Sequence, residues 1–99
     1  MHLVTVLYPH KDGGRFDFDY YMKKHIPRVS GLLGKSIDVR RGLSSPFGTP
    51  THFVAIATIH IDSIDEFQPM FAEHGAEIMA DIPNFTNIEP IVQFDEALS

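Results

Sequence analysis

The stretch Phe16-Asp17-Phe18-Asp19-Tyr20-Tyr21-Met22-Lys23-Lys24-His25-Ile26-Pro27 predicts the first helix of the fold and contains the strongest candidates for chemistry. Residues four apart lie on the same face of a helix. Tyr21 and His25 therefore point the same way, and Val29 and Leu32 continue the stripe. A histidine in an apolar stripe is either a neutral core residue with a satisfied hydrogen bond or a proton-transfer group at the floor of a cavity.

The ends of this helix are marked in the sequence. Asp17 is a typical N-cap, because its carboxylate can accept a backbone N–H bond in the first turn. Pro27 lies where the helix should be in mid-course and lacks the N–H that the helix needs, so we expect a kink or a break near His25 and Ile26. Gly34 follows the last helical turn and is typical of a C-terminal cap.

Four strands and a second helix complete the predicted order. β-rich or alternating patterns predict strands over residues 2–8, 36–43, 52–61 and 85–94, and Pro90 places the last at an edge of the sheet or at a bulge. Ser63-x-x-Glu66 is a capping box that opens the second helix. The expected buried stripe of this helix is Ile64, Phe67, Phe71, His74 and Ile78, and a turn follows at residues 81–84.

The order βαββαβ most simply gives an α+β fold, the ferredoxin-like sandwich, as a single domain over residues 1–99. Two helices cover only one face of a four-stranded sheet, whereas the strands read as apolar on both faces. A bare apolar face of that size is unfavourable in a monomer. We therefore expect the sheet to pack against the same sheet of a second copy in an isologous homodimer.

Composition narrows the classes of partner. The net charge is −5 and no large basic cluster is present, which argues against binding to nucleic acid or to an anionic membrane. The absence of cysteine agrees with a reducing compartment, and neither a signal peptide nor a membrane-spanning apolar run is evident. We expect a cytoplasmic protein. No phosphate cradle, dinucleotide fingerprint, nucleophile elbow or metal-ligand cluster is recognisable, so no cofactor or metal is expected.

Two motifs resemble those of a known family. Phe16-Asp17-x-x-Tyr20-Tyr21-x-x-x-His25-x-Pro27 and Asp81-Ile82-Pro83-Asn84-Phe85-Thr86-Asn87 are similar to the EthD family, named from ethyl tert-butyl ether degradation. The resemblance implies a dimeric α+β barrel, with a cleft between helices and sheet in each subunit. Members are associated with oxidoreductase or catabolic contexts. Relatives on this scaffold include methylmuconolactone isomerases, polyketide cyclases and cofactor-free monooxygenases. The functional histidine of the isomerases falls on His25, but their cysteine partner has no counterpart here.

The candidate catalytic residues are His25, which can exchange a proton near neutral pH, and Tyr21, which could orient the imidazole or donate to a substrate carbonyl. Candidate substrate-binding residues are Tyr8, His74, Asn84 and Phe85. For each a structural role is the alternative: strand-end packing for Tyr8, helix filling for His74 and turn formation for Asn84.

Three functions remain open from the sequence. In the first, a homodimer binds an apolar, oxygen-bearing metabolite, and His25 moves a proton in an isomerisation, cyclisation or oxidative step of a catabolic pathway without a cofactor. In the second, the protein is a non-catalytic carrier or accessory module for a partner oxygenase. In the third it is a scaffold whose cleft is filled by phenylalanine side chains. Whether the protein is an enzyme is therefore left undecided.

Overall fold

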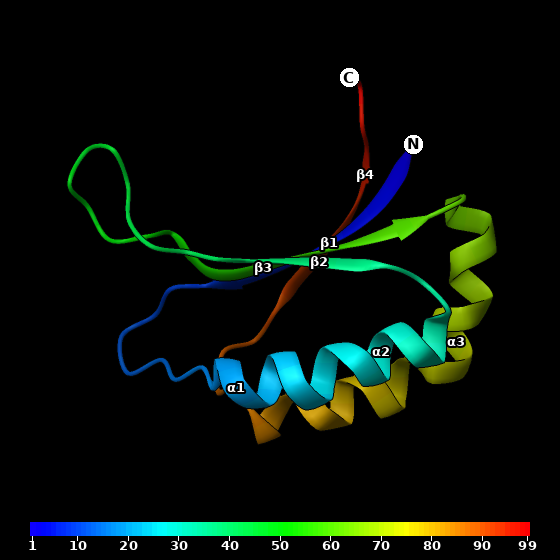
Figure 1. The fold of residues 1–99 in the computed structure, drawn as a ribbon, viewed down its shortest axis with the longest axis horizontal. Helices are drawn as coiled ribbons and strands as arrows, with labels where there is room; N and C mark the ends of the chain where they lie inside the picture. The colour runs from blue at the N-terminus through cyan, green and yellow to red at the C-terminus, as the bar shows by residue number, and fades with distance from the viewer.

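Two long helices, the first made of three consecutive segments, pack on a four-stranded antiparallel sheet in a computed structural model that describes residues 1–99. The strands are β1 (His2–Pro9), β2 (Ile37–Arg41), β3 (Phe53–Ile61) and β4 (Ile91–Glu96), in the spatial order β2-β3-β1-β4. The helical segments are α1 (Phe18–Tyr20), the π-helical η1 (Tyr21–His25), α2 (Ile26–Leu33), α3 (Ile64–Asp81) and the short 3₁₀ segment η2 (Ile82–Asn84), of which α1, η1 and α2 run on as one helix. This arrangement confirms the predicted ferredoxin-like α+β fold (Figure 1).

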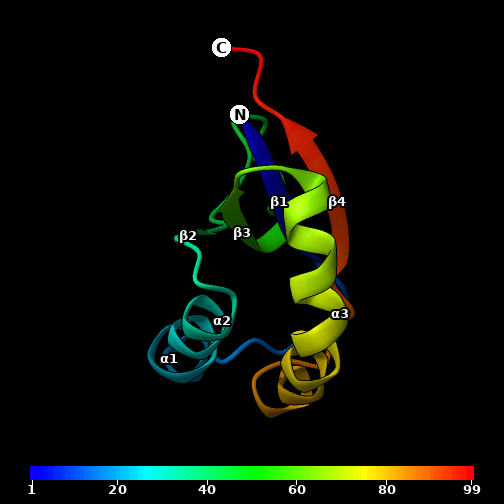
Figure 2. The ribbon, with the colours of Figure 1, turned by 90° about the vertical axis from the view of Figure 1, so that its right-hand side faces the viewer.

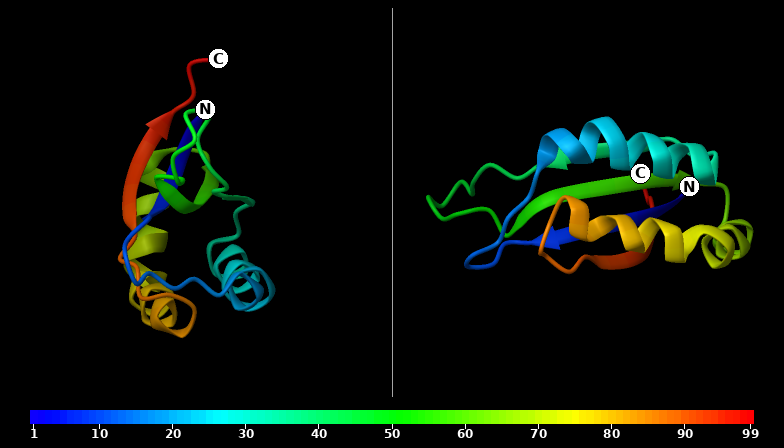
Figure 3. Two further views of the ribbon diagram at one scale, coloured as in Figure 1. Left: turned by 90° about the vertical axis from the view of Figure 1, so that its left-hand side faces the viewer. Right: turned by 90° about the horizontal axis from the view of Figure 1, so that it is seen from below.

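Both long helical segments lie on one face of the sheet, as the views along and beneath the sheet show (Figures 2 and 3). Alternate residues of each strand point to this face. Val4 and Tyr8 of β1 and Ala57 and Ile59 of β3 point there and are buried. Burial of these side chains against the helices is the main stabilising contribution of the core.

The opposite face of the sheet is mixed and is not apolar throughout as the sequence had suggested. Its apolar part is a row across three strands, in which Leu7 pairs with Ile56 on one side and with Ile91 on the other. The neighbouring row is polar, because Thr5 pairs with Thr58 and with Gln93. On this face, β1 and β3 alternate apolar and polar residues. Their sequences look continuously apolar because the residues in between, which point to the helices, are apolar.

The first helix is continuous through Pro27 and contains a widened turn. Asp17 caps its start by accepting a hydrogen bond from the Tyr20 N–H at 3.1 Å, as predicted. Neither a kink nor a break follows; instead Tyr21–His25 form a π-helical turn, in which the Ile26 N–H donates to the Tyr21 carbonyl. Pro27 supplies the reason, since a proline withdraws one N–H from the regular ladder and its ring crowds the carbonyl four residues back. The helix ends at Gly34 with φ +62°, as predicted.

The second helix, α3, begins at the predicted capping box, where the Ser63 hydroxyl accepts from the Glu66 N–H at 3.0 Å. It bends along its course (Figure 1), and Pro69 inside it accounts for a bend. The buried face of α3 contains Gly75, whereas the sequence analysis had placed His74 on that face. Gly75 packs closely on Phe71, since a Cβ there would lie 3.2 Å from that ring.

The last strand begins later than predicted. Residues 85–90 are outside any strand, apart from an isolated bridge between Phe16 and Thr86, and β4 covers Ile91–Glu96. Phe85, Thr86 and Ile88 are buried, because they pack under the start of the first helix, and their apolar pattern comes from this packing. β4 is an edge strand, as Pro90 had indicated.

Candidate functional site

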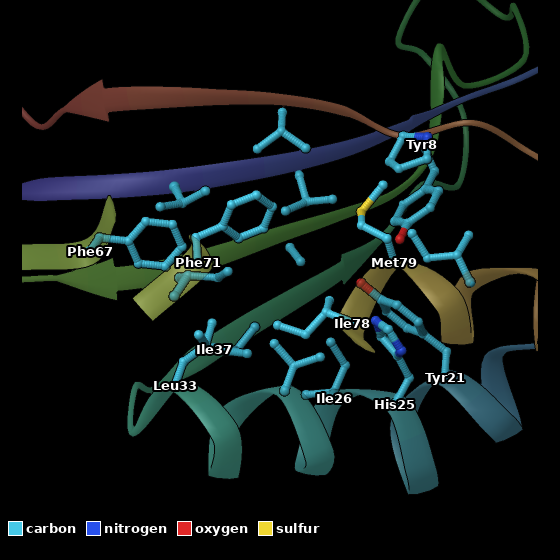
Figure 4. A pocket seen from close by; sticks show the side chains of 18 of the residues that line it. Tyr8, Tyr21, His25, Ile26, Leu33, Ile37, Phe67, Phe71, Ile78 and Met79 are labelled. Carbon is cyan, nitrogen blue, oxygen red and sulfur yellow. The ribbon is translucent and has the colours of Figure 1, made fainter. Parts of the chain in front are cut away.

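A cavity of about 280 Å³ lies between the helices and the sheet (Figure 4). Side chains from all four strands and both long helices line it, and 17 of its 20 lining residues are hydrophobic. Val92 and Phe94 of β4 and Phe71 and Met79 of α3 line it and are also exposed. The cavity therefore reaches solvent between α3 and the edge strand β4.

Three polar side chains meet at one end of this apolar cavity. Tyr8 comes from the end of β1, and Tyr21 and His25 come from the π-helical turn (Figure 4). The two phenol oxygens and His25 Nε2 have no hydrogen-bond partner in the protein, yet no fully buried side-chain nitrogen or oxygen is left unpaired. These three atoms therefore border the cavity and are available to a ligand.

Tyr21 and His25 are the first and last residues of the π-helical turn and lie on one face of the helix. Their rings stack with centroids 5.5 Å apart and an interplanar angle of 16°. Phe85 packs against both, with its ring centroid 4.6 Å from that of His25 and 4.9 Å from that of Tyr21. Phe85 is completely buried. It supports the two cavity-facing rings from behind, and each loses rotational freedom as a result.

Behind the imidazole is a buried carboxylate that sequence analysis did not single out. Asp81 Oδ2 lies 2.8 Å from His25 Nδ1. Asp81 Oδ1 accepts from the Tyr20 hydroxyl at 2.7 Å and from the Asn84 amide at 2.9 Å. His25 and Asp81 are 5% and 7% exposed. The four side chains join the first helix to the end of α3.

The environment fixes the charge of each group. Burial lowers the pKa of His25 and outweighs the opposing effect of Asp81, so the imidazole is neutral at pH 7. Burial alone would raise the pKa of Asp81, but the hydrogen bonds from Asn84, His25 and Tyr20 reverse this and lower it to about 2. Burial raises the pKa of both Tyr8 and Tyr21, and mutual repulsion adds to the rise for Tyr21. Both phenols are therefore neutral hydrogen-bond donors.

The structure brings some of the predicted site residues together and leaves others apart. His25, Tyr21 and Tyr8 line the cavity. Phe85 touches the rings of His25 and Tyr21 without lining it, and the Asn84 side chain binds Asp81. His74 does not line the cavity, because the buried residue at this point of α3 is Gly75. The Nε2 atom of His74 lies 3.7 Å from a carboxylate oxygen of Glu73.

Tyr20 and Asp81 belong to the site although sequence analysis gave them no role. Both lie inside the two motifs that resemble the family, and Asp81 is the acidic residue at the end of the α3 stripe. No local pattern pairs residues 56 positions apart, as His25 and Asp81 are. No group of three or more histidine, aspartate or glutamate side chains is arranged to hold a metal ion, and no helix is long and apolar enough to span a membrane.

Solved structures with the same fold come from three bacteria. An EthD-like protein from Ralstonia eutropha JMP134 is 39% identical, with a TM-score of 0.92 over 99% of this chain and 92% of that one. An EthD family protein from Bacillus halodurans C-125 is 18% identical, with a TM-score of 0.70 over 99% of both chains. HapK from Hahella chejuensis shares 14% identity and the fold, with a TM-score of 0.54 over 100% of this chain and 95% of that one.

No curated protein matches this chain. The model of the EthD domain matches residues 15–89, which include the helix with Tyr21 and His25 and the segment with Asp81. This match, together with the 39% identical relative, confirms the resemblance drawn from the two motifs. The chain belongs to the EthD family.

Proposed function

We propose that the protein binds an apolar, oxygen-bearing metabolite in the cavity and that His25 exchanges a proton with it in an isomerisation, cyclisation or oxidative step of a catabolic pathway. The single observation that carries this proposal is the meeting of three polar atoms without protein partners at one end of a largely apolar cavity. A ligand that fills the cavity would displace water from these atoms, and polar groups without water lower stability unless they are paired. A ligand oxygen placed between Tyr8, Tyr21 and His25 would pair them.

The volume of the cavity also supports a bound ligand. A space of about 280 Å³ is close to the lower end of the usual range for small-molecule sites, roughly 300–1,000 Å³. Its apolar lining favours a hydrocarbon body, and the polar end selects a ligand with one oxygen-bearing terminus. Tyr21 would donate a hydrogen bond to that oxygen, which is the role that the sequence suggested for it.

The test uses the molecule that the protein itself retains. Native mass spectrometry of the purified protein identifies any small molecule that co-purifies, and incubation of that molecule with the protein is followed by chromatography. We expect product with the wild type and with His52→Gln, a matched change at an exposed histidine, and none with His25→Gln. Equal turnover by His25→Gln overturns the catalytic proposal. Binding without product in the wild type supports the carrier function for a partner oxygenase instead.

We propose further that the protein is a homodimer, joined through the sheet face that the helices leave open. The row Leu7, Ile56 and Ile91 supplies an apolar strip there, and Ile91 is 52% exposed. Leu43 and Phe47 in the connection between β2 and β3 are 84% and 90% exposed, and this connection projects beyond the sheet (Figure 1). Contact with a second copy would cover these side chains.

Sedimentation velocity tests the dimer directly. The wild type is expected to sediment as a dimer at micromolar concentration, and Leu7→Glu, which puts a charge in the middle of the strip, as a monomer. A wild type that sediments as a single 11.2 kDa particle overturns this proposal. The cytoplasmic location expected from composition stays a prediction.

A further inference from the structure

Both oxygens of the Asp81 carboxylate have hydrogen-bond partners in the protein, and Asp81 does not line the cavity. Tyr20 and Asn84 both donate to Oδ1, and Oδ2 faces His25 Nδ1 at 2.8 Å. A carboxylate with a pKa of about 2 is ionised at neutral pH and can only accept hydrogen bonds. The contact with His25 therefore requires that Nδ1 carry a hydrogen.

This requirement fixes the tautomer of the imidazole. A neutral histidine has one N–H and one lone pair, on different nitrogens. With the hydrogen on Nδ1, the lone pair is on Nε2, the nitrogen that has no partner in the protein and borders the cavity. We propose that Asp81 is the positioning residue that presents His25 to the cavity as a base, so that the first proton moves from the ligand to Nε2.

This inference rests on the proposed function and narrows its substrate class. A base beside two neutral phenol donors suits a carbonyl compound with an acidic adjacent C–H, or a phenol. In the first case the C–H bond breaks, its proton goes to Nε2 and its electron pair ends on the carbonyl oxygen as an enolate. Tyr8 and Tyr21 stabilise that oxyanion by donating hydrogen bonds. Return of the proton from Nε2 to another ligand atom completes an isomerisation without an oxidant or a cofactor.

The charges around the imidazole support the same direction of transfer. Arg28 of α2, paired with Glu77 of α3 at 2.6 Å, lowers the pKa of His25, as burial does. Both effects keep the resting imidazole neutral and its lone pair free. The negative charge of Asp81 then stabilises the imidazolium after it has accepted a proton, as a carboxylate does behind a catalytic histidine. Tyr8, Tyr20, Tyr21 and Asn84 are the other polar groups in this environment, and all four are neutral.

The variant Asp81→Asn separates a positioning role of Asp81 from a purely structural one, because only the positioning role predicts a change in the tautomer of His25. In the variant, the hydrogen-bond donors Tyr20 and Asn84 still require an oxygen at the position of Oδ1, so the amide nitrogen must occupy the position of Oδ2. That nitrogen donates to His25 Nδ1 and so forces the hydrogen onto Nε2. The base is then lost from the cavity while the size of the side chain is unchanged.

Long-range ¹H–¹⁵N NMR spectra of the ligand-free protein report the tautomer of each histidine. We expect the Nδ1–H form for His25 in the wild type and in Glu73→Gln, which removes one exposed negative charge elsewhere on α3, and the Nε2–H form in Asp81→Asn. An Nε2–H form in the wild type overturns the inference without any variant, should Asp81→Asn fail to fold. A wild-type tautomer retained in folded Asp81→Asn also overturns it. No ligand is needed, so failure here is distinct from failure of the proposed turnover.

The substrate class is tested with 4-nitrophenol, whose anion absorbs at longer wavelength than the neutral form. Below the pKa of free nitrophenol, we expect added wild type and Glu73→Gln to increase the anion band, because Nε2 takes the proton and the two tyrosines bind the phenolate. Asp81→Asn is expected to produce at most a tenth of that increase. An unchanged spectrum at saturating wild-type protein overturns the assignment of a phenol or enol as the ligand class.

Discussion

The two ends of the cavity are built from different kinds of side chain. At one end, Val29, Leu33, Ile59 and Phe67 belong to a buried cluster that contains no polar side-chain atom. At the other, Tyr8, Tyr21 and Phe85 form an aromatic cluster beside His25. The phenol oxygens of Tyr8 and Tyr21 and the Nε2 atom of His25, which have no partner in the protein, all lie at the aromatic end. Packing accounts for the aliphatic end, whereas the proposed ligand would bind to the polar atoms of the aromatic end.

The largest expected effect tests whether the aromatic end also contributes to the core. Phe85→Ala removes a completely buried ring and is expected to lower the free energy of unfolding by about 3–5 kcal/mol. Leu33→Ala, at the aliphatic end, is expected to lower it by about 2–5 kcal/mol. Urea denaturation measures both. A loss below about 1 kcal/mol for Phe85→Ala would contradict the buried position that supports His25 and Tyr21.

Removal of the buried carboxylate should come next in size. Asp81→Ala leaves the Tyr20 hydroxyl, the Asn84 amide and His25 Nδ1 without their acceptor. We expect a loss of about 2 kcal/mol in the free energy of unfolding, because hydrogen bonds to a charged group are stronger than neutral ones. Glu73→Ala, which removes an exposed carboxylate of the same helix, is the control and should change stability little. Equal effects of the two changes would mean that the network contributes nothing.

Stability should depend on pH through the same pair of residues. Because the pKa of folded His25 is below its ordinary value of 6.5, the unfolded chain binds this proton more readily, and stability falls as the pH drops below 6.5. One proton gives a slope of at most about 1.4 kcal/mol per pH unit. Asp81 adds a second loss, of about 2 kcal/mol, as the pH falls from 3.8 to about 2. Thermal denaturation of His25→Gln should lack the first step and keep the second.

The smallest expected change in stability separates the two neighbouring tyrosines. Tyr21 is more buried than Tyr20, but its hydroxyl has no partner in the protein, whereas that of Tyr20 binds Asp81. Tyr21→Phe should change the free energy of unfolding by less than about 0.5 kcal/mol, and Tyr20→Phe should lower it more. Calorimetry with 4-nitrophenol should show weaker binding by Tyr21→Phe. A clear destabilisation by Tyr21→Phe would mean that its hydroxyl is already paired.

Much of the fold follows from local signals. The N-cap Asp17, the capping box from Ser63 and the C-terminal Gly34 each act within one turn of chain, and all three were predicted correctly. The last strand was placed too early because Phe85 and Ile88 are buried in the aromatic cluster, and a buried segment is apolar whether or not its backbone forms a strand. The open face of the sheet was expected to be apolar throughout for a related reason. The apolar content of each strand was considered as a whole, without assigning each residue to one side of the strand.

Tyr8, Tyr21 and His25 were named as candidates and line the cavity, but the carboxylate behind the imidazole was not named. Tyr21 and His25 are four apart, and their common face could be derived from helix geometry. Asp81 reaches the imidazole through the packing of α3 against the first helix, and no periodicity encodes that contact. His74 was assigned to the wrong side of α3 because the stripe was extended with regular spacing across Pro69, while the helix packs through Gly75.

The widened turn at Tyr21–His25 also bears on how the site tolerates a change in chain length. A π-helical turn is an α-helix that has gained one residue, and losing one residue would restore the regular spiral. A deletion at Lys23, on the solvent side, would leave Tyr21 three positions before His25, and residues three apart are still neighbours on a regular helix. The extra residue therefore sets how the two rings are offset along the helix and does not decide whether they share a face.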